Sequence, residues 1–495
     1  MSTLIPGHNA PLQPTSVSII PQNTDETQRP DASYQHPYYR ENICIWEKII
    51  ASCIGEDAVK ALNPLPYLNR SDKSEENVER NQRYLERAVY FNATGRTLEG
   101  LIGLAFATDP TVTLGPFDYM ADNANGNGVS IYHTAQVALA GVLQTGRHGL
   151  LVDVVNDRPA ILSYDARDII NWRTSNQEGR NDLTLLVLRE IYVDETDPYA
   201  SLFVEQFREY RMVDGVAGFR LWRRDSKSKR LTLVNDFSPI LRPHSSRRFF
   251  DHIPFFFCGS KSNSPDIDVP PLKSLSDMNY AHFRDSADYQ DSVHFCGQVQ
   301  PWITGLSEEW RDWLETKGVY VGSRRALLLP AGSQYGMAQA QPNSLAKEAM
   351  DDKKEYMVAL GARIVEENKT TKTATQAAGD IATGTSVLSL CSSNVSEAVT
   401  AALSECGQFF NAESFKDANF RITHDYVTSK LDAQMITSLV AAWQSGAIAA
   451  KDLRTVLRNA GIIEPERTDA QIQEEVDSEM PSFNTSPVAP PVTGQ

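Results

Sequence analysis

PPLKSLSDMNYAHFRDSADYQDSVHFCGQVQPWITG, residues 270–305, predicts one long helix with definite ends. Pro270 and Pro271 stand where the first turn of a helix tolerates proline, and Pro301 prevents a helix from continuing. No glycine or proline interrupts the sequence between Pro271 and Gly297. About 25 helical residues at 1.5 Å each form a rod of roughly 40 Å, which is long for a globular protein.

The faces of this predicted helix are unusual. A stripe at steps of three and four residues is only half apolar, because Leu275 and Val293 share it with Asn279, His282 and Ser286. We expect either an ordinary amphipathic helix with a solvated face, or a helix that packs one flank against an identical subunit in a ring. Another face, about a third of the circumference at 100° per residue, is acidic. It contains Asp277, Asp285, Asp288 and Asp291, with Arg284 among them.

The composition limits the classes of function. The chain has 495 residues, enough for two or three domains, and a formal net charge of −16. Proteins that grip nucleic acid by charge are usually basic, so we expect the bulk field to repel DNA. We find no apolar run of 18 residues and no secretory signal, and we therefore expect no membrane contact. Six cysteines without CxxC spacing are expected to be buried, reduced thiols.

The first half of the chain predicts helices followed by strands. Residues 1–35 are polar and rich in proline, which predicts an extended or disordered arm. Helices are expected at 40–62, 76–107 and 130–145. From Leu150 to Phe257, β-branched and aromatic runs alternate with turns, and this pattern predicts an antiparallel β block.

The second half predicts long helices. A stripe of Leu345, Ala349, Tyr356, Leu360 and Ile364 faces one way on a helix at 345–367. The remaining expected elements are a short helix at Glu308–Lys317 with strands at 318–323 and 326–331, a polar loop at 368–372, a helix at about 373–411, a strand at 420–427, two helices within 432–460 and an acidic, proline-rich, disordered tail from 464.

Enzymatic signatures are missing. The sequence has no GxxxxGK[ST], HExxH, CxxC or GxSxG pattern, and we therefore expect no catalytic, metal-binding or cofactor-binding residue. One alternative is a metal-dependent DNA-processing enzyme that uses Asp285 and Asp288. Such sites need carboxylates converging from different elements, whereas these two lie along one helix.

Three stretches, taken with the order of elements, resemble the portal (head-to-tail connector) proteins of tailed bacteriophages. The resemblance is strongest to a branch often known only as an uncharacterised phage domain. The stretches are RYLERAVYFNATGRTLEGLIGLAFATDP (83–110), the run from IPFFFCG through the long helix to WITG (253–305), and LGARIVEENKTTKTATQAAGDIATGTSVLSLCSSNVSEAV (360–399).

The resemblance implies an α+β portal fold with wing, stem, clip and crown, in which long stem and wing helices accompany an antiparallel β block. The implied division is an arm at 1–35, the wing at 36–269, a first stem helix at 270–296, the clip at 297–343, a second stem helix at 344–367, a tunnel loop at 368–372, a long wing helix with its return strand at 373–431, crown helices at 432–463 and a disordered tail at 464–495.

The resemblance also implies a function without catalysis in this chain. A dodecameric ring at one capsid vertex of the virion would let double-stranded DNA pass during genome packaging and ejection. Its partners would be the terminase large subunit, which hydrolyses ATP, then the head–tail adaptor, and the major capsid and scaffolding proteins. Assembly would occur in the host cytoplasm.

The resemblance gives candidate residues for the channel. A conduit must let DNA slide, so an acidic wall would keep phosphates away while two lysines make weak contacts. The loop residues that would face DNA are Asn368, Lys369, Thr370, Thr371 and Lys372, and those that would line the stem are Asp277, Arg284, Asp285, Asp288 and Asp291. Besides the metal-dependent enzyme, a virion scaffold or adaptor without a DNA channel stays open as an alternative.

Overall fold

The computed structural model forms two units, Met1–His424 and Asp425–Gln495, which are described separately. It combines helices with antiparallel sheets, as expected for an α+β protein. The described residues are 31–473, except 67, 178–179, 198, 226–227, 229, 244–247, 299, 318–328, 340–343, 362–373, 411–414, 424–432, 460–462 and 464–466.

The predicted long helix is confirmed as α6, Lys273–Gly297, with 25 residues. It begins later than Pro270, because Pro271 and Leu272 form a turn before the first helical residue. At the other end the backbone of Gln298 is extended, which ends the helix one residue after its only glycine. The physical stops at both ends are therefore those that the sequence predicted.

Five helices precede the β block. The predictions for 40–62 and 130–145 are confirmed, the first as two consecutive helices. These helices are α1 (Pro37–Ile54), α2 (Glu56–Ala61), α3 (Glu75–Arg87), α4 (Ala93–Ala105) and α5 (Ile131–Thr145), with short 3₁₀ turns at Gly115–Ala121 and, later, Ala166–Asp168.

The single helix predicted for 76–107 is wrong, because the chain breaks between α3 and α4. Asn92 caps α4 by accepting a hydrogen bond from the Gly95 amide at 3.0 Å. The Tyr90 amide donates to Glu56 and the Val89 amide to Ser286. These partners come from distant sequence, so periodicity alone could not indicate the break.

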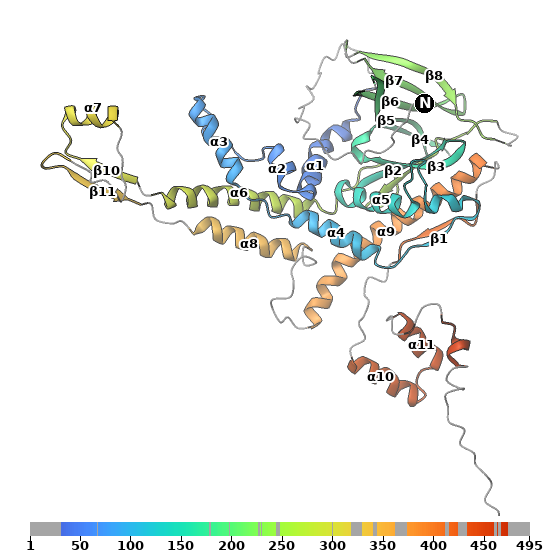
Figure 1. Cartoon of the computed structure of the whole chain (residues 1–495). Coiled ribbons are helices and arrows are strands. Elements are labelled where there is room, and N and C mark those ends of the chain that lie inside the picture. The colour runs from blue at the N-terminus through green and yellow to red at the C-terminus, as the bar shows by residue number, and fades with distance from the viewer. Residues whose placement is uncertain are drawn as a thin grey trace, which may run out of the picture. The chain divides into compact units, whose positions relative to one another are not determined.

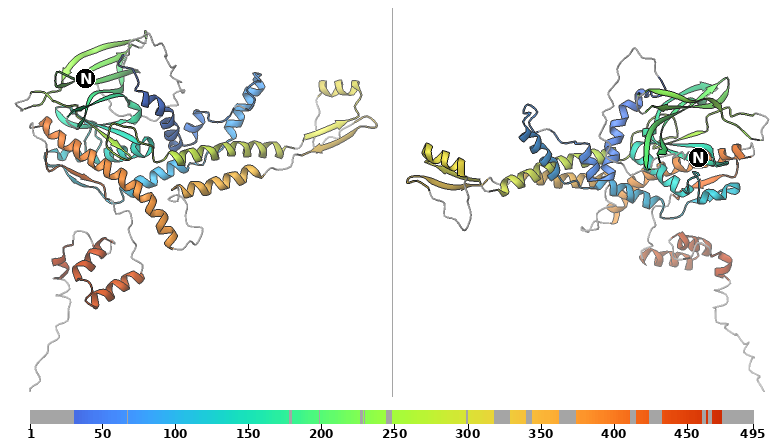
Figure 2. Two further views of the ribbon diagram at one scale, coloured as in Figure 1. Left: turned by 180° about the vertical axis from the view of Figure 1, so that it is seen from behind. Right: turned by 45° about the horizontal axis from the view of Figure 1, so that its top comes forward.

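The β block contains two antiparallel sheets (Figure 2). Phe255 and Phe257, at the end of the predicted block, are buried at the start of β9. One sheet has the order β3-β2-β9 and the other β4-β5-β6-β7-β8. The strands are β2 (Arg147–Val155), β3 (Arg158–Asp165), β4 (Ile169–Gln177), β5 (Arg180–Asp197), β6 (Ala200–Val213), β7 (Val216–Arg224), β8 (Leu231–Pro239) and β9 (Phe255–Gly259).

After α6 the chain forms a small α/β segment and then returns (Figure 1). The helix predicted at Glu308–Lys317 is confirmed as α7. It lies between two strands that the sequence analysis did not predict, β10 (Gln300–Thr304) and β11 (Gln334–Ala338), which pair with each other. Residues 318–328, which contain most of the predicted strands, lie outside the described residues.

Two helices complete the first unit. The helix predicted at 345–367 is present as α8, Leu345–Ala359, but it is shorter than predicted, because Leu360 and Gly361 form a turn. The helix predicted at 373–411 is confirmed as α9, Ala374–Phe410. The return strand is shorter than predicted, since β12 covers only Asn419–Arg421 and pairs with β1, Thr111–Thr113.

The second unit contains the two predicted helices, α10 (Ala433–Gln444) and α11 (Ala450–Asn459). The prediction of disorder from residue 464 is wrong for residues 467–473, which include a helical turn. Arg458 on α11 forms an ion pair with Asp469 at 2.6 Å, and this ion pair links the helical turn to α11.

Two expectations from composition concern the whole chain. Within the described part, no helix has both the length and the hydropathy required to cross a membrane. None of the six cysteines, all of which are described, forms a disulfide. Cys258, Cys391 and Cys406 are buried, and burial raises the pKa of the Cys258 thiol to about 12. Cys44 is exposed, so the expectation of burial is wrong there.

Candidate functional site

The candidate site is the rod, defined here as α6 and α8. Both views in Figure 2 show the two helices side by side, with β10, β11 and α7 beyond their ends. Because α6 leads toward β10 and α8 leads away from β11, the two helices are antiparallel. Every residue that we proposed for the stem lies on α6.

The first half of α6 is buried by polar contacts with the N-terminal helices. Asn279, which is fully buried, donates to the hydroxyls of Tyr90 and Thr94. The Ser276 and Ser52 hydroxyls lie 2.8 Å apart. The part of the half-apolar stripe from Leu275 to Ser286 is therefore a buried seam in which Asn279 and Ser286 are hydrogen-bonded, and such bonds offset the cost of burying polar groups, whereas Val293 is exposed.

Aromatic packing surrounds this seam. Tyr280, Phe283 and Ala287 of α6 join one buried cluster with residues of α2, α3 and the α3–α4 break. The Phe283 ring meets the Tyr90 ring edge-on, with centroids 5.8 Å apart. This half of the rod is consequently held in place by its own chain and does not need a second copy.

Three residues of the acidic face are exposed, namely Asp277, Arg284 and Asp288. Asp277 forms an ion pair with Lys273 one turn earlier at 2.6 Å, and 61% of its side chain is exposed. Arg284 is also exposed. At 100° per residue they point the same way, so solvent reaches this face along two turns of α6.

The other three aspartates contact other elements. Asp285 forms an ion pair with Lys353 of α8, and both side chains are only about a quarter exposed, at 23% and 24%. Asp288 accepts a hydrogen bond from the Tyr84 hydroxyl of α3.

The last of the three, Asp291, accepts from Arg87 of α3 at 3.0 Å. Burial, together with Asp288, raises the pKa of Tyr84 above its usual range. Sequence periodicity grouped the aspartates within a third of the circumference, but it could not show that Asp285 would contact α8 while Asp288 and Asp291 contact α3.

The contacts of Asp285 and Asp288 bear on the hypothesis of a metal-dependent DNA-processing enzyme. Asp285 is directed toward α8 and Asp288 toward α3, so the two carboxylates serve different neighbours. Among the described residues, no group of three histidine, cysteine, aspartate or glutamate side chains is placed to hold a metal ion.

His282 lies where α6 meets α8. It is buried, and neither ring nitrogen has a hydrogen-bond partner among the described residues. Burial lowers its pKa, and nearby Lys354 acts in the same direction. The ring packs against Phe91 with centroids 5.9 Å apart. His282 is therefore a neutral side chain that contributes packing.

The returning helix α8 exposes an apolar face. Met357, which is 1% exposed, points toward the packed side, whereas Leu345 is 70%, Tyr356 59% and Leu360 48% exposed. The stripe of Leu345, Tyr356 and Leu360 is visible in the sequence, but its exposure to solvent is not. Large apolar side chains gathered on one face mark an interaction surface more often than an ordinary solvated one.

The segment beyond the rod exposes further apolar side chains. Trp302 of β10 is 42% exposed and Trp313 of α7 is 52% exposed. Met337 of β11 is 59% exposed, and Phe295 near the end of α6 is 64% exposed. Trp302, Trp313 and Met337 lie within residues 297–343, the segment expected to be the clip. Their exposed side chains form a candidate contact surface.

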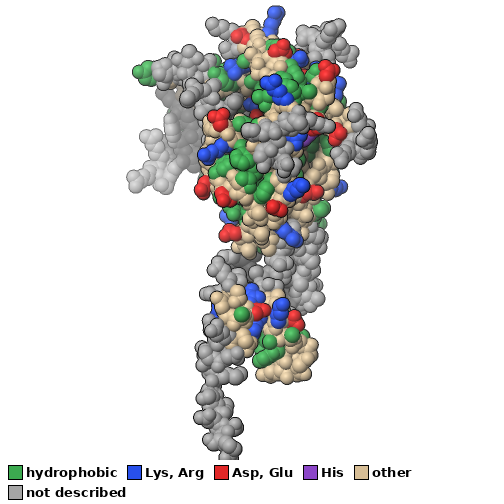
Figure 3. Space-filling view, turned by 90° about the vertical axis from the view of Figure 1, so that its right-hand side faces the viewer, with side chains coloured by type: hydrophobic (Ala, Val, Ile, Leu, Met, Phe, Trp, Pro, Cys, Tyr) green, Lys and Arg blue, Asp and Glu red, His purple; other side chains and the backbone are tan. Residues whose placement is uncertain are grey.

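The predicted tunnel loop, Asn368, Lys369, Thr370, Thr371 and Lys372, lies outside the described residues. On the face of the first unit seen in Figure 3, basic and acidic side chains are interspersed, with apolar patches between them. That face shows no broad basic region of the kind that grips nucleic acid.

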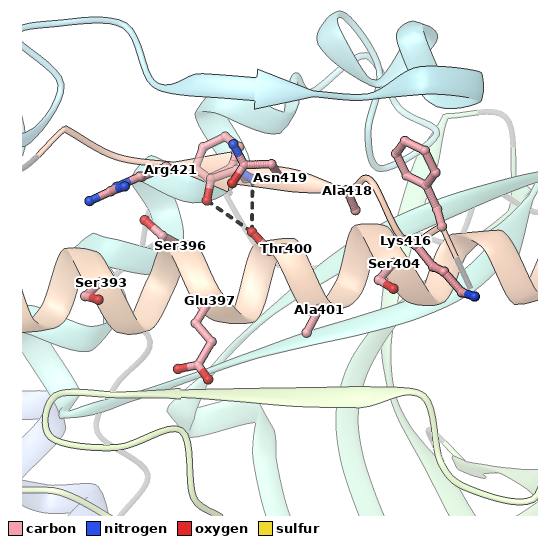
Figure 4. Close-up of a pocket in the computed structure, with 12 residues that line it drawn as sticks. Ser393, Ser396, Glu397, Thr400, Ala401, Ser404, Lys416, Ala418, Asn419 and Arg421 are labelled. Carbon is pink, nitrogen blue, oxygen red and sulfur yellow. Dashed lines mark hydrogen bonds between the residues drawn. The ribbon is translucent and has the colours of Figure 1, made fainter.

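A polar groove of about 480 Å³ lies between α9 and the return segment (Figure 4). The Thr400 hydroxyl donates to the Phe420 carbonyl at 3.1 Å and accepts from the Phe420 amide at 2.9 Å. Ser396 accepts from the Ile422 amide at 3.0 Å. Ser396 and Thr400 are four helical residues apart, a rise of about 6.0 Å. Phe420 and Ile422 are two extended residues apart, a rise of about 6.6–6.8 Å, so the spacing of the two hydroxyls matches the spacing of the two backbone amides.

This match explains the groove without a ligand. Its lining includes one carboxylate, Glu397, and no histidine or cysteine. Glu397 accepts a hydrogen bond from the side-chain amide of Asn263 at 3.1 Å. The hydroxyls of Ser396 and Thr400 replace a neighbouring strand, and the groove has no set of groups suited to acid–base chemistry.

A protein-family model described as "Domain of unknown function (DUF4055)" matches residues 271–410, the span from α6 to the end of α9. No curated protein matches the chain.

Solved structures of gene transfer agent particles are similar to the chain. A chain in the virion of the native particle has 14% identity and a TM-score of 0.42, over 74% of this chain and 89% of that one. A chain in the neck of the empty particle, computed with C6 symmetry, has 14% identity and a TM-score of 0.40, over 74% and 90%. A chain in the neck of the native particle, computed with C12 symmetry, has 13% identity and a TM-score of 0.38, over 74% and 89%.

Proposed function

We propose that this chain is a portal protein of a tailed bacteriophage. Copies of it form a ring, with twelve as the expected number, at one capsid vertex, and double-stranded DNA passes through the ring. The chain itself performs no catalysis. The terminase, which supplies ATP hydrolysis, and later a tail adaptor dock at the segment that contains β10, α7 and β11.

The observation that carries this proposal is the pair of unlike exposed faces on the rod. One face of α6 presents Asp277 and Arg284, and one face of α8 presents Leu345 and Tyr356. A solvated helix pair would not need the second face. Burying a large apolar side chain contributes roughly 1.5–3 kcal/mol, so contact between copies through α8 would be favourable.

A ring also accounts for the acidic face. If α8 packs against the next copy, part of α6 is left toward the lumen, where Asp277 repels phosphates and Arg284 moderates the field. Weak, exchangeable contact suits a conduit better than tight binding, because tight binding would stop the DNA from moving. The lumen-lining roles of Asp285, Asp288 and Asp291 belong to the same proposal.

The assembly is tested by native mass measurement and negative-stain imaging of the purified chain. We expect rings with a central hole for the wild type. We expect monomers for the double variant Leu345→Asp/Tyr356→Asp, because it places charge on the apolar face of α8.

The matched control is Lys347→Glu, which makes the same net charge change at an exposed position of α8 outside the stripe. Circular dichroism should show all three proteins folded. A wild type that stays monomeric at assembly concentrations would contradict the portal function. Rings that form normally in the double variant would contradict only the role of the α8 face.

A further inference from the structure

Arg147 is a buried charge without a hydrogen-bond partner. It begins β2 directly after α5 and is 1% exposed. None of its three side-chain nitrogens bonds to a described residue. Its guanidinium carbon instead lies 3.8 Å from the Trp172 ring and 4.4 Å from the Phe257 ring.

Such a charge needs compensation. Burial lowers the pKa of Arg147 to about 9, which leaves it protonated at neutral pH. Asp266 favours its charge from a distance but forms no ion pair with it. The end of α5 supplies part of the compensation, because a helix C-terminus carries partial negative charge.

A neutral imidazole covers the other face of the same tryptophan. His36, the residue that caps α1, stacks on Trp172 with centroids 4.1 Å apart. Since the guanidinium of Arg147 is also within 4 Å of that ring, the two groups must lie on opposite faces. Arg147, Arg173 and Arg40 all lower the pKa of His36 after the effect of burial, and no carboxylate acts on it.

We name Arg40, Arg147 and Arg173, the three arginines that act on His36, the cationic patch. Arg40 and Arg173 are exposed, and neither forms an ion pair within the described part of the chain. Three arginines around one histidine, without an ion pair among the described residues, are unexpected in a chain whose formal net charge is −16. The patch therefore attracts an anionic group, which Arg40 and Arg173 can reach from the surface.

The chain enters the structure beside this patch. The His36 amide donates to the Ile170 carbonyl at 2.8 Å, and the Tyr34 amide donates to the Asp31 carbonyl at 3.0 Å. Ala32 is buried. The residues that immediately follow the N-terminal arm are thus fixed against the sheet that carries Trp172.

The arm contains one acidic site. Among residues 1–30, the carboxylates are Asp25 and Glu26, which are adjacent. Four residues lie between Glu26 and Asp31. The five residue-to-residue steps span at most about 17 Å. The short tether gives the carboxylates a high effective concentration near the patch.

We propose that the cationic patch binds the acidic pair Asp25–Glu26 of the same chain and so fixes the N-terminal arm. Arg40 and Arg173 donate charge-assisted hydrogen bonds to the two carboxylates, while Arg147, behind Trp172, contributes through its field. DNA is the weaker candidate, because the acidic chain as a whole repels phosphates.

The test is limited proteolysis of residues 1–30 in the full-length protein at low and high salt. We expect wild-type cleavage to be several-fold slower at low salt. The arm variant Asp25→Asn/Glu26→Gln and the patch variant Arg40→Gln/Arg173→Gln should both be cleaved quickly at either salt concentration. Arg29→Gln, which changes charge in the same arm without removing a carboxylate, is the control and should keep the protection.

Charge reversal gives a second readout. Arg173→Glu alone should release the arm, and adding Glu26→Arg should restore part of the protection. Equal cleavage of the wild type and of Asp25→Asn/Glu26→Gln would overturn the proposal, and that variant cannot fail by unfolding the body. Protection that grows with protein concentration would assign the arm to a second copy and overturn the same-chain contact. Inorganic phosphate that binds the patch without releasing the arm would also overturn it.

Discussion

At the scale of single residues, His252 shows how ion pairs stabilise a charged side chain between two segments of the chain. His252 lies between two carboxylates, with Asp251 at 3.0 Å and Glu405 of α9 at 3.1 Å. Burial disfavours the charged imidazolium, but hydrogen bonds to Glu405 and Asp251 outweigh it and raise the pKa of His252 to about 9. The pair joins the loop before β9 to α9.

This histidine makes stability depend on pH. The raised pKa means that the folded state binds the proton more tightly than the unfolded state, where the pKa is about 6.5. The contribution is complete below pH 6.5 and is lost as the pH rises through about 9. Since 39% of the side chain is exposed, screening reduces the contribution to about 1 kcal/mol.

We therefore expect His252→Gln to lower the free energy of unfolding by about 1 kcal/mol at pH 6 and by almost nothing at pH 10. Denaturant titrations of both proteins at the two pH values measure this. A difference that is equal at pH 6 and pH 10 would show that packing, and not the proton, explains the contribution.

At the scale of elements, α9 shows how a helix substitutes for a strand. The β12 strand pairs with β1 along one edge, and hydroxyls of α9 satisfy its backbone along the other. Phe420, which is 1% exposed, depends on this arrangement, because its amide and its carbonyl both bond to Thr400.

Thr400→Val keeps the shape of the side chain and removes both hydrogen bonds. We expect the free energy of unfolding to fall by about 1–3 kcal/mol, the usual cost of leaving a buried backbone group unsatisfied. Thermal and denaturant unfolding measure the loss. Ser404→Ala is the control, since the Ser404 hydroxyl makes no hydrogen bond to a described residue, and it should be nearly neutral.

At the scale of the whole molecule, the tunnel-loop hypothesis makes a prediction about DNA. We expect the double variant Lys369→Ala/Lys372→Ala to assemble into rings but to package or retain less DNA, because the weak phosphate contacts are lost. Ring formation is checked by imaging and packaged DNA by nuclease protection. Normal packaging and retention in this variant would refute the role of the two lysines.

Several local features could be predicted from the sequence because short-range physics controls them. Prolines and glycines around α6, the extent of α7, and the cap and αL glycine that bound α5 depend on residues close in the chain. Most strands of the β block followed from alternation and turn residues, but β4 did not. The break between α3 and α4 could not be predicted, because Glu56 and Ser286 hold it from far away.

The same division applies to the candidate site. Periodicity placed Asp285 and Asp288 on one face of α6 and grouped Leu345 with Tyr356 on α8. It could not show that Lys353 and Tyr84 would meet the aspartates, or that the apolar stripe would stay exposed. The burial of Arg147 without a hydrogen-bond partner could not be predicted from the sequence, since its surroundings form only when β2, β4 and β9 come together.

The sequence by itself therefore determined where α6 and α9 begin and end and which residues share a face of a helix, because helix geometry is a property of neighbours within a few residues. Only the tertiary structure decided which of those faces are buried, paired or left exposed. That outcome depends on contacts between segments far apart in the chain, such as α3 with α6, and a periodic pattern does not specify them.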